Sequence, residues 1–294
     1  MAKARALDRR RRSVRNIRKI TRTMELIATA RFKKAMDRSI AARDYTKQLV
    51  KILENIASVG GSVSHPLLEV RPTKRSAVLV LSGNRGLCGG YNSNIVRQAV
   101  AMIGQWKSER VDASVAVSGK RGISALKFRG IDMDEKYTSF EDKPAFDAVM
   151  PIGQAYLDAY TAGTIDRLDV VYTRFHSIAR QEAVTEMLLP LKPPEAAGTA
   201  AAAGQLASQA YDFYPSAESI LEEILPASFL SRLFKCFLDA AVSEQVARMV
   251  AMKAASENAA GLIKNLSRRY NRARQSQITG EIMEILGGVE ALKQ

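Results

Sequence analysis

The N-terminal part of the chain carries one narrow stripe of apolar residues at alternating spacings of three and four. Between Ala2 and Val59 there is neither glycine nor proline, so no residue there is expected to interrupt a helix. Such a helix would be about 85 Å long, since each residue adds about 1.5 Å. The stripe follows a heptad repeat, which predicts a coiled-coil helix. It consists of Leu7, Arg10, Val14, Ile17, Thr21, Met24, Ala28, Arg31, Ala35, Arg38, Ala42, Tyr45, Leu49, Ile52, Ile56 and Val59.

A second stripe of the same kind runs through the C-terminal part, between Ala227 and Leu286. Its steps are Leu238, Val242, Gln245, Met249, Met252, Ser256, Ala259, Ile263, Leu266, Tyr270 and Ala273. Two helices of similar length, each with one apolar stripe, most simply bury those stripes against each other. We therefore expect an antiparallel coiled coil of the two chain ends. Its seams are rich in alanine, which buries little area per residue, so the predicted shaft is slender.

Between these helices, strand-like and helical patterns alternate. The expected strands are residues 75–82, 113–118, 167–174 and 182–191, and the expected helices are 92–107, 120–128 and 147–162. Asn92 is the expected N-terminal cap of the first of these helices. The alternation predicts a mostly parallel sheet covered on both faces, as in a Rossmann-like α/β domain.

The expected organisation is therefore an α/β fold combined with a long antiparallel α-helical coiled coil. In chain order it comprises an N-terminal helix (1–60), a linker (61–74), the α/β domain (75–191), a linker rich in alanine, glycine and proline (192–215) and a C-terminal helix (216–294).

The net charge of +14 is concentrated at the N-terminus. Residues 1–51 hold 17 lysines and arginines against 4 acidic residues. Such a field attracts an acidic partner, which could be nucleic acid, anionic lipid or an acidic protein surface. Two cysteines and two histidines are too few for a disulfide framework or a structural zinc site, and no apolar run is long enough to span a bilayer.

One glycine-rich loop, Ser82–Asn92, stands between an expected strand and an expected helix, where backbone amides often bind phosphate. Its letters match neither the P-loop nor the dinucleotide fingerprint, which favours a structural turn. Cys88 in this loop could be a nucleophile only with a base, and His176 is the candidate within this domain. A buried structural thiol is the simpler interpretation.

From residue patterns alone, two functions stay open. A basic coiled coil that binds nucleic acid would explain the N-terminal charge, and its duplex binding would depend steeply on salt. A nucleotide-dependent α/β enzyme with helical arms would use the loop Ser82–Asn92, and it would bind nucleotide without other chains.

Four segments of the sequence resemble a known family, the γ subunits of F-type ATP synthases. They are KITRTMELIATARFKKA (19–35), LSGNRGLCGGYN (81–92), SEQVARMVAMKAASENA (243–259) and YNRARQSQITGEIMEILGGVEAL (270–292). They occur in the family's order and cover both ends and the middle of the chain. The family's fold, a coiled coil of the terminal helices with an α/β domain, agrees with the periodicity.

The resemblance implies a central rotor shaft rather than an enzyme. Such a shaft turns with a membrane ring driven by ions and forces three catalytic sites in a ring of alpha and beta subunits through successive states. The implied partners are the alpha and beta subunits, with the epsilon subunit and the membrane c-ring at the base, and not nucleic acid. No cofactor or metal is implied. The expected location is the cytoplasmic face of a bacterial cell membrane, because the N-terminal sequence has no presequence pattern, and a processed organellar chain is the open alternative.

The resemblance also implies contact residues. Met24 matches a helix position that faces an acidic loop of a catalytic subunit, and Arg22 and Lys33 would add complementary charge. Arg274, Gln275 and Thr279 match polar contacts to another loop of the ring. The sequence departs from the family pattern at Asn84, where aspartate is usual, at Tyr214, where glutamate is usual, and at Gly280, where glutamine is usual; these departures bear on subunit contacts.

Overall fold

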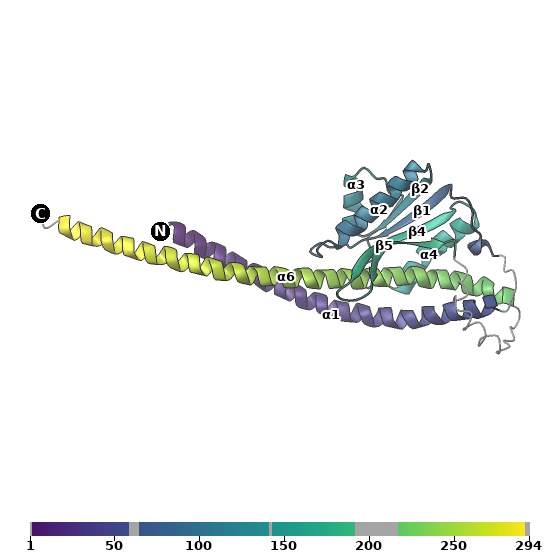
Figure 1. Ribbon diagram of the computed structural model, residues 1–294, viewed down its shortest axis with the longest axis horizontal. Coiled ribbons are helices and arrows are strands. Elements are labelled where there is room, and N and C mark those ends of the chain that lie inside the picture. The colour runs from purple at the N-terminus through teal and green to yellow at the C-terminus, as the bar shows by residue number, and fades with distance from the viewer. Residues whose placement is uncertain (1, 59–64, 141–142, 192–216, 292–294) are drawn as a thin grey trace. The chain divides into compact units, whose positions relative to one another are not determined.

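The computed structural model describes residues 2–58, 65–140, 143–191 and 217–291, which form two compact units. Two long helices, α1 (Ala2–Ser58) and α6 (Ala217–Ala291), each contribute to both units. The first unit contains the beginning of α1, up to Thr29, and the end of α6, from Arg248. The second unit contains the rest of both helices and a five-stranded sheet (Figure 1).

The sheet is mostly parallel, as the alternating pattern predicts. Its strands are β1 (Arg75–Leu81), β2 (Asp112–Ser118), β3 (Glu135–Tyr137), β4 (Arg167–Phe175) and β5 (Gln181–Leu189), in the spatial order β3-β2-β1-β4-β5. The pairs among β1 to β4 are parallel, and β5 runs antiparallel to β4 as an edge strand. The connecting helices are η1 (Pro66–Leu68), α2 (Tyr91–Ser108), α3 (Lys120–Phe128) and α4 (Phe146–Thr161).

Alternating side chains of β1 fill two separate cores, one on each face of the sheet. Val78 and Val80 belong to a cluster with α2 and α3 that also buries Trp106. Leu79 and Leu81 point to the other face, where α4 and α6 supply the cover. Because both faces are buried, β1 is apolar at nearly every position, which is why this strand could be recognised in the sequence.

Helix α6 passes over the carboxyl ends of β1 and β4. The Tyr91 hydroxyl donates a hydrogen bond to the Ala240 carbonyl (3.0 Å), and the Ser243 hydroxyl donates to the Thr173 carbonyl (3.1 Å). In open α/β sheets this edge is where ligands usually bind. Here side chains of α6, including Phe237, help to enclose a residual cavity of only about 30 Å³. The helix thus occupies the crevice that a nucleotide would need.

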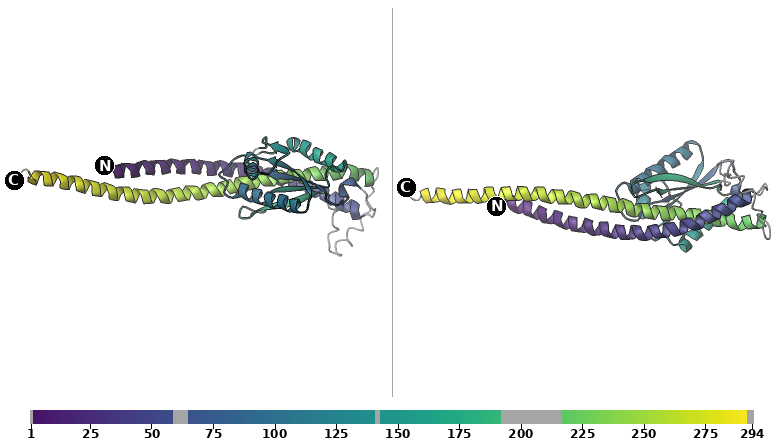
Figure 2. Two further views of the ribbon diagram at one scale, coloured as in Figure 1. Left: turned by 90° about the horizontal axis from the view of Figure 1, so that it is seen from above. Right: turned by 60° about the horizontal axis from the view of Figure 1, so that its bottom comes forward.

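In the first unit, α1 and α6 run antiparallel. The Arg11 guanidinium lies 4.7 Å from the centre of the Tyr270 ring, whereas Arg15 and Arg22, further along α1, lie by Ile263, which is earlier in α6. Figure 2 shows the pairing of these two segments from two further sides.

The seam predicted for α6 is confirmed, since each of its steps is buried or half-buried. The seam predicted for α1 is confirmed at every seventh residue from Leu7 to Leu49, and at Met24, Arg31 and Arg38, which are half-buried. The predicted steps at Arg10, Ile17, Tyr45 and Ile52 are wrong, because these side chains are exposed. A second series, one position further along, is buried or half-buried as well and is mostly polar. It contains Arg11, Glu25, Phe32, Ser39 and Thr46.

Three further expectations concern the cap of α2, the start of α6 and the two linkers. The expected cap at Asn92 is wrong, because α2 begins at Tyr91 and the Asn92 side chain binds the preceding loop instead. Helix α6 includes Pro226 and begins before the predicted stripe. Residues 192–215 and Tyr214 within them lie outside the described residues, as do residues 61–64 of the other expected linker.

Asp239 of α6 is a buried carboxylate, 3% exposed, at the packing of α6 against the sheet. Burial raises its pKa to about 6. Lys235 on the same helix, Arg43 on α1 and Arg174 on β4 act in the opposite direction, and Glu186 on β5 adds to the rise. Between about pH 6 and pH 3.8 the Asp239 carboxyl is protonated in the folded protein and ionised in the unfolded chain. Ionised Asp239 therefore destabilises the fold above pH 6, and this penalty disappears as the pH falls toward 4.

We predict that Asp239→Asn stabilises the protein at pH 7.5 by about 1–3 kcal/mol, since a shift of one pKa unit corresponds to about 1.4 kcal/mol. The gain should vanish near pH 4. Urea unfolding followed by the fluorescence of Trp106, the single tryptophan, measures both values. An equal gain at both pH values would show that ionisation of Asp239 is not the cause.

Two helical glycines give a matched test of packing. A Cβ atom on Gly153 of α4 would lie 2.4 Å from Leu230 Cδ2 and 3.2 Å from Leu233 Cδ2 on α6, whereas one on Gly104 of α2 would meet nothing within 4 Å. Gly153→Ala should therefore destabilise the protein by about 1–2 kcal/mol through overpacking. Gly104→Ala should stabilise it by about 0.5–1 kcal/mol, since alanine favours the helix. Urea unfolding of both variants decides, and shifts of the same sign would refute this account of the α4–α6 contact.

Candidate partner-binding surface of the shaft

A basic groove lies between α1 and α6 in the first unit. It has a volume of about 770 Å³ and is lined by Arg15, Arg18, Lys19, Arg22, Thr23 and Ile263. Four of these side chains are cationic and none is acidic. The four positive charges repel one another, and an acidic group bound between them would reduce that repulsion. The groove is therefore suited to bind carboxylates or phosphates.

Arg22 is the residue of this groove whose position is fixed by a neighbour. Its Nη1 atom lies 2.7 Å from Glu25 Oε1, one helical turn further along α1. Glu25 occupies a buried seam position and is 9% exposed, whereas the Arg22 side chain is 60% exposed. The pair therefore holds one end of Arg22 against the coiled coil and leaves much of its guanidinium toward solvent.

The four consecutive arginines before this groove, Arg9 to Arg12, differ in their surroundings. Asp8 binds Arg11 and Arg12, with N–O distances of 2.6 and 2.8 Å. Burial raises the pKa of Asp8, but the two guanidinium groups outweigh it and hold that pKa below its usual value. Arg9 and Arg10 are exposed. Arg11 also stacks on Tyr270, so the seam includes a cation as part of its packing.

The residues that the resemblance assigned to ring contacts lie at three places. Met24 is half-buried beside the seam, next to Arg22, and Lys33 is exposed on the part of α1 that belongs to the second unit.

On α6, Arg274, Gln275 and Thr279 are exposed, and the Thr279 hydroxyl donates to the Gln275 carbonyl (3.0 Å). Gln275 follows Ile263, which lines the basic groove, by twelve residues or roughly 18 Å. The structure therefore places these residues in separate patches rather than in one site.

Sequence analysis missed an apolar surface at the end of α6. Its exposed side chains are Ile278, Ile282, Met283, Ile285, Leu286 and Val289. Spacings of three and four within this set could have revealed it, because they align these side chains along one side of a helix. Gly280 lies in the same segment of α6, and a Cβ atom there would meet nothing within 4 Å. Exposed apolar side chains of this number indicate a surface that binds protein.

The loop Ser82–Asn92 is fixed by hydrogen bonds between backbone amides and side chains of the same chain. The Gly83 amide donates to Asn92 Oδ1 (2.8 Å), and the Lys120 amide donates to Asn84 Oδ1 (3.0 Å). The Gly122 amide donates to Ser82 Oγ (2.9 Å). The Gly83 amide belongs to the loop, whereas Lys120 and Gly122 belong to α3, so side chains of the loop bind the start of that helix.

Asn84 also donates to the carbonyls of Thr138 (3.2 Å) and Phe140 (2.8 Å), which an aspartate could not do when ionised. Cys88 is buried, as the structural interpretation expected, and its sulfur accepts from Asn92.

Within the described residues, no group of three or more histidine, cysteine, aspartate and glutamate side chains could hold a metal ion. Over the same residues, no helix combines the length and apolar character that crossing a bilayer requires.

The chain matches known proteins over nearly its whole length. Residues 3–292 match the family model described as ATP synthase. The chain is 60% identical to the ATP synthase gamma chain of Rhodopirellula baltica, with all of both chains covered. It is 38% identical to that of Dehalococcoides mccartyi, with 99% of this chain and 100% of the relative covered.

Solved structures show a similar fold at low sequence identity. The rotor of the Euglena gracilis mitochondrial ATP synthase matches with a TM-score of 0.64 at 18% identity, covering 94% of this chain and 99% of that chain. The central stalk of the Tetrahymena thermophila mitochondrial ATP synthase matches with a TM-score of 0.60 at 21% identity, covering 81% of this chain and 99% of that chain. Taken with the two full-length relatives, these matches mean that the chain belongs to the family of ATP synthase gamma chains.

Proposed function

We propose that this chain is the central rotor shaft of an F-type ATP synthase and does no chemistry itself. The observation that carries the proposal is the pairing of two long helices whose outer surface offers a basic groove and an exposed apolar end. Membership of the gamma-chain family supports the same role. The crevice filled by α6 argues against the nucleotide-dependent enzyme.

The proposed mechanism is mechanical coupling between a membrane ring and a catalytic ring. A ligand shifts a conformational equilibrium only when it binds the alternative states with different affinity. A two-helix coiled coil has no threefold symmetry, so a shaft with a basic groove on one side presents different chemistry to each of three identical catalytic subunits at any moment. Rotation then carries each subunit in turn through the states that bind ADP and phosphate, form ATP and release it.

The proposed partners follow from this role. The alpha and beta subunits enclose the coiled coil, and the epsilon subunit and the c-ring bind at the base. Met24, Arg22 and Lys33 on α1 contact an acidic loop of a catalytic subunit, and Arg274, Gln275 and Thr279 on α6 contact a second loop. The complex lies on the cytoplasmic face of a bacterial cell membrane, driven by ions.

Reconstitution tests the proposed role. ATP hydrolysis by a purified ring of alpha and beta subunits should increase when the chain is added, and gel filtration should show co-elution. Absence of both effects, with cognate subunits and a folded chain, would refute the shaft and favour a nucleic-acid binder. Steep salt dependence of duplex binding would then identify that binder.

The double substitution of Arg274→Ala and Gln275→Ala should reduce the stimulated hydrolysis by about five- to tenfold, because a hydrogen bond contributes about 0.5–1.5 kcal/mol net and about 1.4 kcal/mol corresponds to tenfold in rate. Both side chains are exposed, so helix content by circular dichroism should stay unchanged.

Arg129→Ala serves as the matched control, because Arg129 is an exposed arginine at the end of α3 in the α/β domain. Stimulation equal to that of the unmodified chain in both variants would remove Arg274 and Gln275 from the contact surface.

A further inference from the structure

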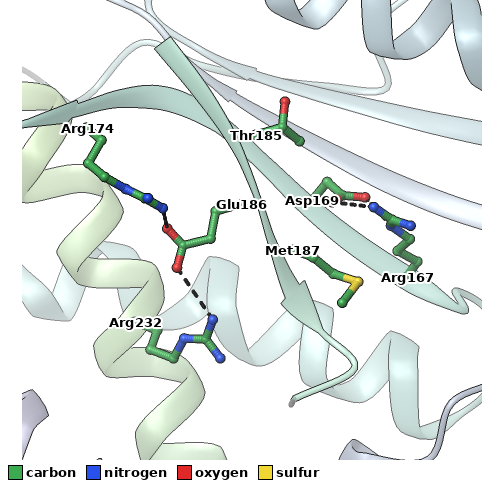
Figure 3. A pocket seen from close by; sticks show the side chains of 7 residues that line it. All are labelled: Arg167, Asp169, Arg174, Thr185, Glu186, Met187 and Arg232. Carbon is green, nitrogen blue, oxygen red and sulfur yellow. Dashed lines mark hydrogen bonds and ion pairs between the residues drawn. The ribbon is translucent and has the colours of Figure 1, made fainter. Parts of the chain in front are cut away.

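A cavity of about 610 Å³ opens beside β5, the edge strand of the sheet. Its lining is shown in Figure 3 and consists of Arg167, Asp169, Arg174, Thr185, Glu186, Met187 and Arg232. Three consecutive residues of β5 take part, and all three are half-buried. In the figure, Glu186 points toward Arg174 and Arg232, and Met187 points the other way. The cavity therefore follows the strand itself rather than one face of the sheet.

A second cavity of about 310 Å³ adjoins the first on the side of α2. The two share Arg167 and Thr185, and the second also involves Trp106 and Met102. Gln98 of α2 donates a hydrogen bond to the Thr185 hydroxyl (3.3 Å), which fixes that wall. The two cavities, together called the β5 groove, therefore lie beside this strand. Its α2 side holds apolar and amide side chains together with the Arg167–Asp169 pair, since Arg167 lies over Trp106, and its α6 side holds Glu186 with Arg174 and Arg232.

Charge in the larger cavity is unbalanced. Arg167 and Asp169 form a bidentate pair, with N–O distances of 2.5 and 3.0 Å. Glu186 is shared, because its Oε2 atom lies 2.7 Å from Arg174 and its Oε1 atom lies 3.4 Å from Arg232. Three guanidinium groups thus face two carboxylates.

Glu186 meets Arg232 only through its Oε1 atom. Its Oε2 atom also accepts the Tyr172 hydroxyl (2.6 Å). Arg232 has five N–H donors, and its contact with Glu186 is the longest of the set. One more carboxylate at this position would balance the charge and use the remaining donors of Arg232.

The edge of β5 supplies the second half of a recognition site. Among the described residues, β5 pairs with β4 alone, so alternate N–H and C=O groups on its other edge face away from the sheet. An extended peptide that added here would place alternate side chains on the face of Glu186, beside Arg232, and the others on the face of Thr185 and Met187. Such strand addition is a common mode of peptide recognition.

We propose that the free edge of β5 is a docking site for an extended segment of a partner protein, which adds as a sixth strand and places a carboxylate against Arg232. The main-chain hydrogen bonds would provide affinity, and Arg232 would select an acidic side chain at one position of the added strand. Apolar side chains at the alternate positions would contact the α2 side of the groove. This site is separate from the coiled-coil surface and does not depend on the proposed rotor role.

A seven-residue probe peptide that alternates valine with glutamate, capped at both ends and fluorescently labelled, tests the proposal on the full chain. We expect binding by fluorescence anisotropy, together with slower hydrogen exchange of residues 184–187. A peptide with lysine in place of glutamate should bind at least tenfold more weakly. A peptide with N-methylated amides on alternate residues keeps every side chain but cannot form the ladder, and it should not bind.

Arg232→Gln should weaken binding of the glutamate peptide by about tenfold, since a charge-assisted hydrogen bond is lost. Arg180→Gln is the matched control, because Arg180 lies in the exposed turn between β4 and β5 and does not line the cavity. Trp106 fluorescence verifies that both variants are folded, and the N-methylated peptide tests the ladder without any substitution.

The proposal is overturned by any of three results. They are no binding at millimolar peptide, equal binding of the glutamate and N-methylated peptides, and protection on α1 instead of β5. The last would show that the peptide recognises only the basic groove.

Discussion

The packing of helix α6 against the carboxyl edge of the sheet is the contact on which the second unit depends. Between Leu225 and Val246 most side chains of α6 are buried and the others are half-buried, so this segment of the helix is enclosed on all sides. Its hydrogen bonds with Tyr91 and Thr173 anchor it at the ends of β1 and β4. The edge of the sheet where a nucleotide could have bound is covered by a helix instead, and the α/β domain fixes that helix in place.

This arrangement divides the work of the protein between its two units. In the segment of α6 that packs against the sheet, apolar side chains are buried, Asp239 is desolvated, and Arg232 pairs with Glu186 of β5. In the first unit, by contrast, the two helices bury little beyond a narrow seam and leave arginines and isoleucines exposed. A rotating shaft needs both properties, because transmitting torque requires one segment that is rigidly packed and another whose exposed surface is chemically varied.

Apolar periodicity was sufficient to predict the two long helices and four of the five strands. Strand β3 was missed because Glu135–Tyr137 is short and polar, and pairing with β2 alone makes it a strand. The α1 seam is wider than predicted, because the polar Glu25 and Ser39 beside the predicted steps are buried as well through tertiary packing. The groove at β5 could not be predicted, since Arg232 and Glu186 are 46 residues apart.

Single-molecule rotation tests the central claim most directly. Cys88 and Cys236 are buried, so a cysteine introduced by Phe128→Cys, at a position 91% exposed on α3, can carry a bead on the α/β domain. With the chain assembled in an immobilised ring of alpha and beta subunits, ATP should drive the bead around one axis in three steps per turn. ATP hydrolysis by that complex with a stationary bead would contradict the account, because the domain would then not turn with the shaft.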